Sequence, residues 1–335
     1  MKRSLIALAA LAFVGAASAQ SSVTIFGIVD AVVAVGNGDT ANKTRLHNSG
    51  YNSSRLGFRG VEDLGGGMKA SFHLEGALSN DDGTAGGFNF MRKSVVSLMG
   101  SMGELRLGRD YTPNFWSHTV YDPFGTNGVG TTVAMAASAG GGLTGGGATT
   151  VRASNSIGYI SPSVGGFAVW AQTYFGENAS NAASQAGDGS AIRLSYDNGP
   201  LSLAAAFSKT TTGAGTDVQT TNFGGSYNMG VAQLMAFWNK DANTNMKDRT
   251  GYTLGALVPM GQGTVRLAFS NTDYNGAKTD QFALGYVYDM SKRTAVYGTF
   301  ASVSNSGNAA YALNGASTPA NGSSTGFDLG VRHAF

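Results

Sequence analysis

Three arginines precede short, glycine-containing stretches by seven, eight and nine residues: Arg55 before Glu62–Gly67, Arg92 before Gly100–Gly103 and Arg152 before Ser161–Gly166. If each arginine stands on a strand that runs toward the same rim of a sheet, the three side chains lie at nearly the same height on one wall. The one-residue increments fit the stagger of tilted strands. A positive cluster at a narrow point repels cations and attracts anions.

Arg55 and Arg59 alternate with Leu56 and Phe58. Successive side chains of an extended chain point to opposite faces, so both arginines are expected on the polar face of one strand. Arg55, Arg92, Arg152 and Arg59 are therefore the candidate residues of an anion path. The alternative for each is a solvated charge at the rim of the sheet that has no influence on the passage of ions.

Arg92 fits the alternation less well than Arg55 does. It shares its parity with Ser94 but also with Val96 and Leu98, and Lys93 is the competing candidate for the polar face. Parity alone leaves the choice between Arg92 and Lys93 open.

The elements that must position these residues are strands. Runs of roughly ten residues alternate between apolar and polar side chains, and turns or loops separate them. The short connections are Glu62–Gly67, Gly100–Gly103, Ser161–Gly166, Asn198–Pro200, Asn228–Gly230, Pro259–Gly263 and Asp289–Arg293. The long ones are Gly36–Asn52, Leu78–Asn89, Asp110–Val151, Glu177–Gly189, Thr210–Asp217, Lys240–Asp248, Tyr274–Asp280 and Asn305–Ser324. Seven short and eight long connections join sixteen strands.

Short turns at one rim and long loops at the other are typical of bacterial outer-membrane barrels, and a soluble β-sandwich has no reason to sort its connections in this way. After residue 19 the sequence has no apolar stretch of 18 residues. A membrane-embedded form must therefore be a closed sheet. Sixteen strands enclose more volume than side chains fill, so a polar inner face implies a water-filled lumen. The sequence predicts an all-β, 16-stranded antiparallel transmembrane β-barrel.

The connection Asp110–Val151 is by far the longest. Loops of this size are usually functional or disordered. Folded into the lumen, it would narrow the pore opposite the arginines, with Asp110 or Asp122 as counter-charges. The alternative is an exposed loop outside the barrel.

The first residues have the layout of a secretory signal peptide. Lys2 and Arg3 precede the apolar run Leu5–Val14, and Ala17-Ser-Ala19 is a cleavage site of small residues. Residues 1–19 are predicted to be removed, which leaves 20–335 as a single barrel domain. Removal lowers the net charge from +2 to 0, and this argues against a nucleic-acid partner.

No motif points to a cofactor, a metal or catalysis. The chain has no cysteine, and its four histidines lack metal-ligand spacing. Asp81-Asp-Gly83 lacks the spaced oxygen ligands of a calcium loop. His118 lies near serines only within the long loop, without the arrangement that a hydrolase needs.

The last strand, Thr325-Gly-Phe-Asp-Leu-Gly-Val-Arg-His-Ala-Phe335, places Phe327, Leu329, Val331 and Phe335 on one face and resembles the assembly signal of outer-membrane barrels. Three further segments carry a resemblance to a known family. They are Ser22-Val-Thr-Ile-Phe-Gly-Ile-Val-Asp30, Ser54-Arg-Leu-Gly-Phe-Arg-Gly-Val-Glu-Asp-Leu-Gly-Gly-Gly67 and Gly103-Glu-Leu-Arg-Leu-Gly-Arg109. Together they make the chain similar to the Gram-negative general porins, in particular to the anion-preferring porins of β-proteobacteria.

This resemblance implies a homotrimer of sixteen-stranded barrels, each with its third long loop inside the lumen. It also implies contacts with lipid and lipopolysaccharide of the outer membrane and with the barrel assembly machinery. Basic residues at the positions of Arg55, Arg92 and Arg152 are similar to the arginine cluster of the anion-preferring relatives. The expected function is passive diffusion of small hydrophilic solutes with a preference for anions. The alternatives are a substrate-specific channel for small organic anions and a barrel that serves as an anchor or adhesin.

Overall fold

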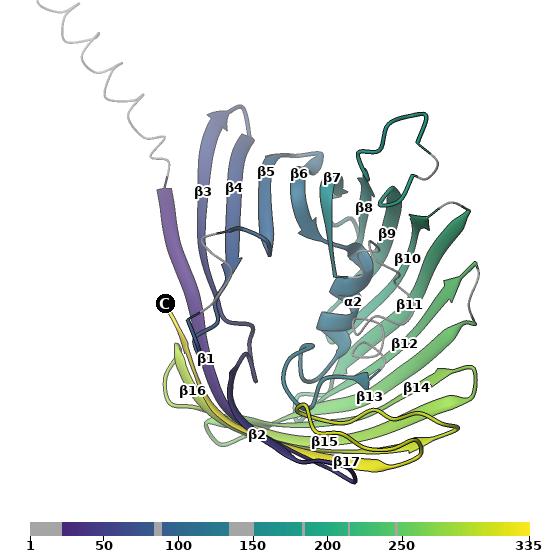
Figure 1. Ribbon diagram of the computed structural model, residues 1–335. Coiled ribbons are helices and arrows are strands. Elements are labelled where there is room, and N and C mark those ends of the chain that lie inside the picture. The colour runs from purple at the N-terminus through teal and green to yellow at the C-terminus, as the bar shows by residue number, and fades with distance from the viewer. Residues whose placement is uncertain (1–21, 84–88, 134–150, 183–184, 214, 245–246) are drawn as a thin grey trace, which may run out of the picture.

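The computed structural model describes residues 22–83, 89–133, 151–182, 185–213, 215–244 and 247–335. The expected signal peptide, residues 1–19, lies outside them. The described residues form one antiparallel sheet that closes into a ring (Figure 1). Its strands are β1 (Ser22–Gly38), β2 (Lys43–Asn48), β3 (Arg55–Gly65), β4 (Met68–Ala77), β5 (Lys93–Gly100), β6 (Gly103–Tyr111), β7 (Arg152–Ile160), β8 (Phe167–Tyr174), β9 (Gly189–Asn198), β10 (Leu201–Gly213), β11 (Thr216–Asn228), β12 (Gln233–Asn243), β13 (Arg249–Met260), β14 (Gly263–Tyr274), β15 (Ala277–Asp289), β16 (Thr294–Ser306) and β17 (Ser323–Ala334).

Sixteen of these strands close the barrel, which confirms the predicted fold class. Strand β1 pairs with β17 along Ile28–Gly38 and with β3 along Ser22–Ile28. The first long connection differs from the expectation of an irregular loop, because it contains the additional strand β2. This strand pairs with β1 beyond the point where β3 ends its own pairing.

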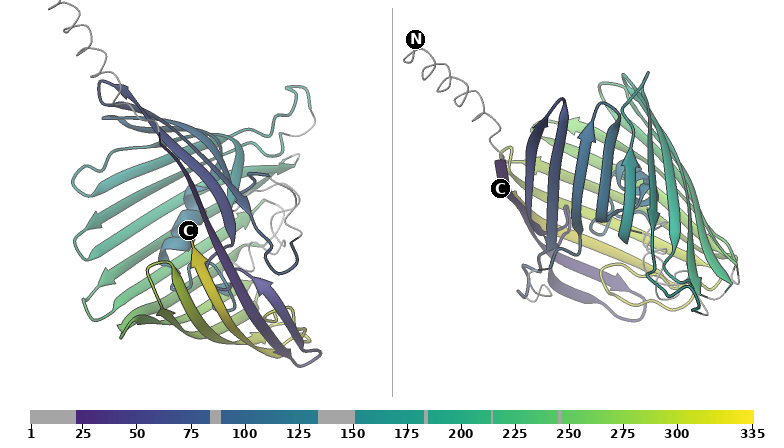
Figure 2. Two further views of the ribbon diagram at one scale, coloured as in Figure 1. Left: turned by 90° about the vertical axis from the view of Figure 1, so that its left-hand side faces the viewer. Right: turned by 90° about the horizontal axis from the view of Figure 1, so that it is seen from above.

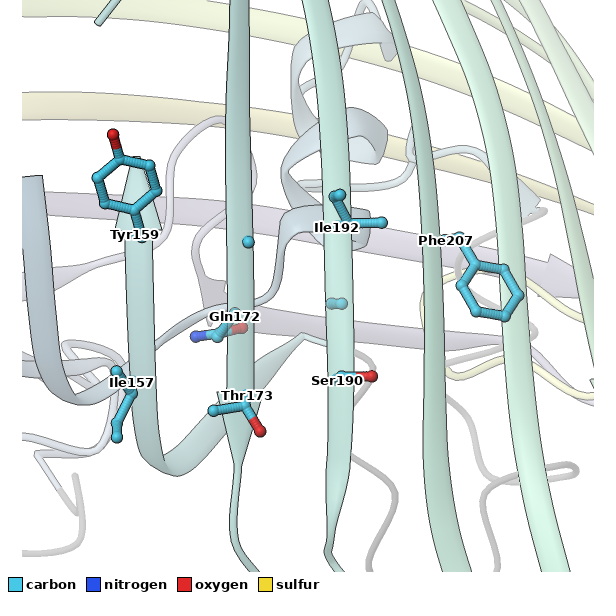
Figure 3. Close-up of a pocket in the computed structure, with 9 residues that line it drawn as sticks. Ile157, Tyr159, Gln172, Thr173, Ser190, Ile192 and Phe207 are labelled. Carbon is cyan, nitrogen blue, oxygen red and sulfur yellow. The ribbon is translucent and has the colours of Figure 1, made fainter. Parts of the chain in front are cut away.

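The two faces of the sheet differ in polarity as the alternation predicts. On β17, Phe327, Leu329 and Val331 are exposed on the outer face, whereas Asp328 between them is buried on the inner face. Figure 3 shows the same outer face around a shallow groove on β7–β10, where Ile157, Tyr159, Ile192 and Phe207 project beside one another. These apolar side chains are exposed because lipid, and not protein, is their solvent.

The connection between β6 and β7 contains the helix α2 (Pro113–Tyr121), which lies within the ring of strands (Figure 1). Thr112 caps its first turn by accepting a hydrogen bond from the Phe115 N–H, and Pro113 occupies the first helical turn, where no N–H is needed. Asn114 Nδ2 donates to the carbonyl oxygen of Thr220 on β11 at 3.2 Å. Among the described residues, no helix has the length and apolar character that a membrane crossing requires.

The residues after α2 are also fixed to the inner wall. Phe124, Val129 and Val133 pack with buried side chains of β14–β16. The Val129 N–H donates to Asp328 Oδ2 at 2.8 Å, and Gln281 Nε2 donates to the Val129 carbonyl at 2.8 Å. Residues 110–133 of the longest connection thus contact the inner faces of distant strands, and residues 134–150 lie outside the described residues.

The seam between β1 and β17 ends in a close contact of Gly27 with Phe335. Their backbones exchange two hydrogen bonds, Gly27 N to Phe335 O at 3.0 Å and Phe335 N to Gly27 O at 3.1 Å. The C-terminus accordingly lies beside β1 (Figure 2). A Cβ on Gly27 would overlap the Phe335 ring and approach the carbonyl oxygen of Arg55 to 2.9 Å.

We expect Gly27→Val to destabilise the closed barrel by about 1–3 kcal/mol, because the added atoms must displace the ring or the backbone. The measurement is the temperature at which the purified barrel loses its compact, heat-modifiable mobility on electrophoresis. Gly298→Val is the matched control, since a Cβ there has no atom closer than 3.9 Å. Equal melting of the two variants would contradict the steric explanation.

Candidate functional site

Glu75 lies between two of the predicted arginines on the inner wall. It is only 5% exposed and stands on β4, between β3 and β5. Its Oε1 accepts a hydrogen bond from Arg92 Nε at 2.7 Å and lies 3.5 Å from Arg55 Nη1. One carboxylate therefore holds both guanidinium groups.

Tyr111 connects Arg92 to the third arginine. Its hydroxyl oxygen accepts hydrogen bonds from Arg92 Nη2 at 2.9 Å and from Arg152 Nη2 at 3.1 Å. The Arg152 guanidinium also lies 4.6 Å from the centre of the Tyr111 ring, within the range of a cation–π interaction. Arg55, Glu75, Arg92, Tyr111 and Arg152 thus form a continuous series of contacts, here called the arginine chain.

The bend before β5 explains why parity could not decide between Arg92 and Lys93. Strand β5 begins at Lys93, whose side chain points inward and whose Nζ lies 3.0 Å from Asp110 Oδ1. Arg92 precedes the strand and is 9% exposed. Its backbone N–H donates to the Glu75 carbonyl at 3.0 Å, and this turns its side chain inward as well. Both candidates therefore lie on the inner wall.

The two carboxylates expected as counter-charges have other partners. Asp110 forms ion pairs with Lys93 and with Arg106, each at 3.0 Å. Asp122 accepts hydrogen bonds from three backbone N–H groups of its own loop. Within the described residues, neither carboxylate pairs with Arg55, Arg92 or Arg152, and Glu75 takes the place assigned to them. Alternation along β4 places Glu75 on the lumen face with His73, but it does not indicate which arginines the carboxylate contacts.

Arg59 lies on the same strand face as Arg55 but outside the arginine chain. Its guanidinium is 5.2 Å from the centre of the Phe26 ring and remains exposed. Arg59 therefore occupies a separate part of the inner wall, nearer the turn between β3 and β4.

The arginine chain has three positive groups and one negative group, a net charge of +2. Tyr111 is also stacked on Phe115 of α2, with ring centres 5.4 Å apart and an angle of 14° between the planes. The arginine chain is thus joined to helix α2. Burial lowers the pKa of His118 on α2 to about 4, so this histidine is neutral near pH 7 and adds no charge. Within the part of the chain that the structure describes, no group of His, Asp and Glu could hold a metal ion.

Replacing Glu75 by glutamine is expected to raise the net charge of the arginine chain from +2 to +3. Arg55 and Arg92 keep a hydrogen-bond acceptor in the amide oxygen, so the fold should tolerate the change. If ions pass this wall, the permeability ratio of anions to cations should increase by roughly two- to tenfold, since one charge at 4 Å contributes about 1 kcal/mol in water. Reversal potentials in a KCl gradient measure this ratio, and a shift toward cations would contradict the assignment. Glu62→Gln, at an exposed position of β3 near the β3–β4 turn, is the control.

Comparison with known proteins agrees with this architecture. Residues 5–308 match the family described as Gram-negative porin. The chain is 43% identical to outer membrane porin protein 32 of Delftia acidovorans, and the alignment covers 100% of both chains. It is 37% identical to major outer membrane protein P.IB of Neisseria meningitidis over 32% of this chain and 34% of that protein.

Two solved structures extend the comparison. The anion-selective porin from Comamonas acidovorans superimposes with a TM-score of 0.87 at 40% identity, over 94% of this chain and 100% of that one. OmpT of Vibrio cholerae, in its trimer form, superimposes with a TM-score of 0.67 at 15% identity, over 94% and 99% of the two chains, and shares the fold alone. The closed barrel, its apolar outer face and the full-length similarity together make this protein a member of the Gram-negative porin family, an outer-membrane channel for passive diffusion of small hydrophilic solutes.

Proposed function

We propose that this porin prefers anions and that the arginine chain sets the preference. The observation that carries the proposal is the proximity of Arg55, Arg92 and Arg152, which share one carboxylate and one hydroxyl group as partners. The net charge of +2 on one wall raises the local concentration of anions and lowers that of cations. The similar porin from Comamonas acidovorans is anion-selective, which supports the same direction.

The third long connection narrows the lumen beside the arginine chain in this proposal. Helix α2 contacts β8–β12, the part of the wall that follows β3–β7 around the ring, and Tyr111 joins its beginning to the arginines (Figure 1). Ions that pass between α2 and the arginine chain meet the positive charge at close range. Binding there must be weak, because an ion that is held tightly would stop the flow.

We further propose that the chain is exported with residues 1–19 as a cleaved signal peptide and that it assembles as a homotrimer. The trimer form of OmpT from Vibrio cholerae, which shares the fold, supports the second point. The outward-facing Phe327, Leu329, Val331 and Phe335 suit recognition by the assembly machinery and contact with lipid and lipopolysaccharide. No catalytic activity and no cofactor are assigned.

The test is the reversal potential of the purified protein in a planar bilayer between KCl solutions that differ tenfold in concentration. Anion preference gives a potential of the sign expected for chloride, up to about 59 mV in magnitude. A potential of the opposite sign would refute the proposal. Absence of conductance would favour an anchor or adhesin, and saturation with a single organic anion would favour a substrate-specific channel.

A further inference from the structure

A pocket with a cavity volume of about 250 Å³ opens on the inner wall. It extends across β1, β3, β4, β5 and β6, on the short-turn side of the arginine chain. Its polar lining includes Thr24, Arg59, Ser71, His73 and Arg106. Arg59 is four residues farther along β3 than Arg55, which corresponds to roughly 13 Å of strand. The pocket is therefore a site distinct from the arginine chain, and it is here called the Arg59 pocket.

An aromatic ring orients the cation of this pocket. The Arg59 guanidinium lies over the face of Phe26, 5.2 Å from the ring centre. The His73 ring meets Phe26 edge-on, at 5.2 Å and an angle of 75°. Phe26 thus holds Arg59 beside the His73 ring without neutralising Arg59, because it offers no carboxylate.

The carboxylates at the edge of the pocket already have other partners. Glu104 accepts two hydrogen bonds from Arg106, from Nε at 2.8 Å and from Nη2 at 2.9 Å. Asp110 pairs with Arg106 and with Lys93. Three cations, Arg59, Lys93 and Arg106, therefore face two anions, and the excess positive charge lies on Arg59. Arg59 forms no ion pair with any carboxylate of the described residues.

We propose that the Arg59 pocket binds a small oxyanion, a carboxylate or a phosphate, as a second station for anions between the arginine chain and the short-turn mouth. A guanidinium presents two parallel N–H donors that match the two oxygens of such an anion. The hydroxyl groups of Thr24 and Ser71 line the same pocket and are the additional donors. The proposal extends the anion preference proposed above, because a second weak site lets an arriving anion release the one ahead of it.

Single-channel conductance in increasing concentrations of potassium phosphate tests the site, and a parallel series in potassium succinate distinguishes the two kinds of oxyanion. We expect the wild-type conductance to saturate with at least one of the two salts. In Arg59→Gln, the concentration for half-saturation should rise about tenfold. Arg59→Lys keeps the charge without the paired donors. Its half-saturation concentration should fall between those of the wild type and Arg59→Gln. The matched control is Lys69→Gln, which removes one cation from the same wall outside the pocket.

Three outcomes overturn the proposal: no saturation with either salt, an unchanged half-saturation in Arg59→Gln, or the same shift in Lys69→Gln as in Arg59→Gln. The KCl reversal potential of the same variants separates this proposal from the anion preference. A wild type that favours anions, together with an Arg59→Gln variant that behaves like it in phosphate and succinate, would remove only the Arg59 pocket. A wild type that favours cations would remove the role of the arginine chain.

Discussion

Serine at positions 55, 92 and 152 together is expected to abolish the anion preference of this porin and to leave a weak preference for cations. The triple change removes three positive charges and leaves Glu75, which is 5% exposed, as the remaining charge of the arginine chain. One charge contributes about 1 kcal/mol to an ion at 4 Å even in water. A change of three charges should therefore alter the permeability ratio by at least about tenfold, since 1.4 kcal/mol corresponds to a factor of ten.

The reversal potential should be measured near 0.1 M KCl, where the Debye length is ~10 Å and the charges are not fully screened. The control is the triple lysine variant at the same three positions, which keeps the charge and loses the fork geometry of the guanidinium group. It should retain the anion preference. If the triple serine variant favoured anions as strongly as the wild type, another part of the lumen would have to set the selectivity.

Asp122→Ala is expected to loosen the connection that carries α2 and to give a larger, noisier conductance. The Asp122 carboxylate accepts hydrogen bonds from the N–H groups of Phe124 at 2.9 Å, Thr126 at 3.0 Å and Thr132 at 3.3 Å. Asp122 is 4% exposed, so water cannot readily replace it. Each buried N–H that loses its acceptor costs about 1–3 kcal/mol, and the loop should lose stability by several kcal/mol.

The strands keep their own hydrogen bonds in this variant, so the melting temperature of the barrel should change little. Open-channel noise and single-channel conductance are the measurements. Asp122→Asn keeps one acceptor oxygen and should give an intermediate result. Asp289→Ala, at the exposed end of β15, should behave like the wild type. A quiet channel of unchanged conductance in Asp122→Ala would show that this carboxylate does not hold the loop.

The number of strands and the order of short and long connections were predictable, because a period of two and glycine-rich turns are local properties of the sequence. The proximity of Arg55 and Arg92 also follows from local distances to the turns. The partners of these arginines do not. Glu75 is 17 residues from Arg92, and Tyr111 is 41 residues from Arg152. Such contacts depend on the register between strands, which alternation alone does not set.

The long connections were the least predictable parts of the chain. The first contains β2, whose six residues are too few to distinguish from a loop by periodicity. The third contains α2, where Trp116, Ser117 and His118 give no apolar stripe that would indicate a helix. The helix depends on tertiary contacts with the barrel wall, such as the hydrogen bond of Asn114 with Thr220. The bend at Arg92 likewise depends on a neighbouring strand, through the Glu75 carbonyl.

The seam between Gly27 and Phe335 has a consequence for folding kinetics. The contacts that complete the ring join residues about 300 positions apart, so they have the largest loop-closure entropy of the sheet and are expected to form late. Until they form, β1 and β17 present unpaired edges, which are prone to pair with other chains. Closure of the ring and protection from aggregation are therefore the same event.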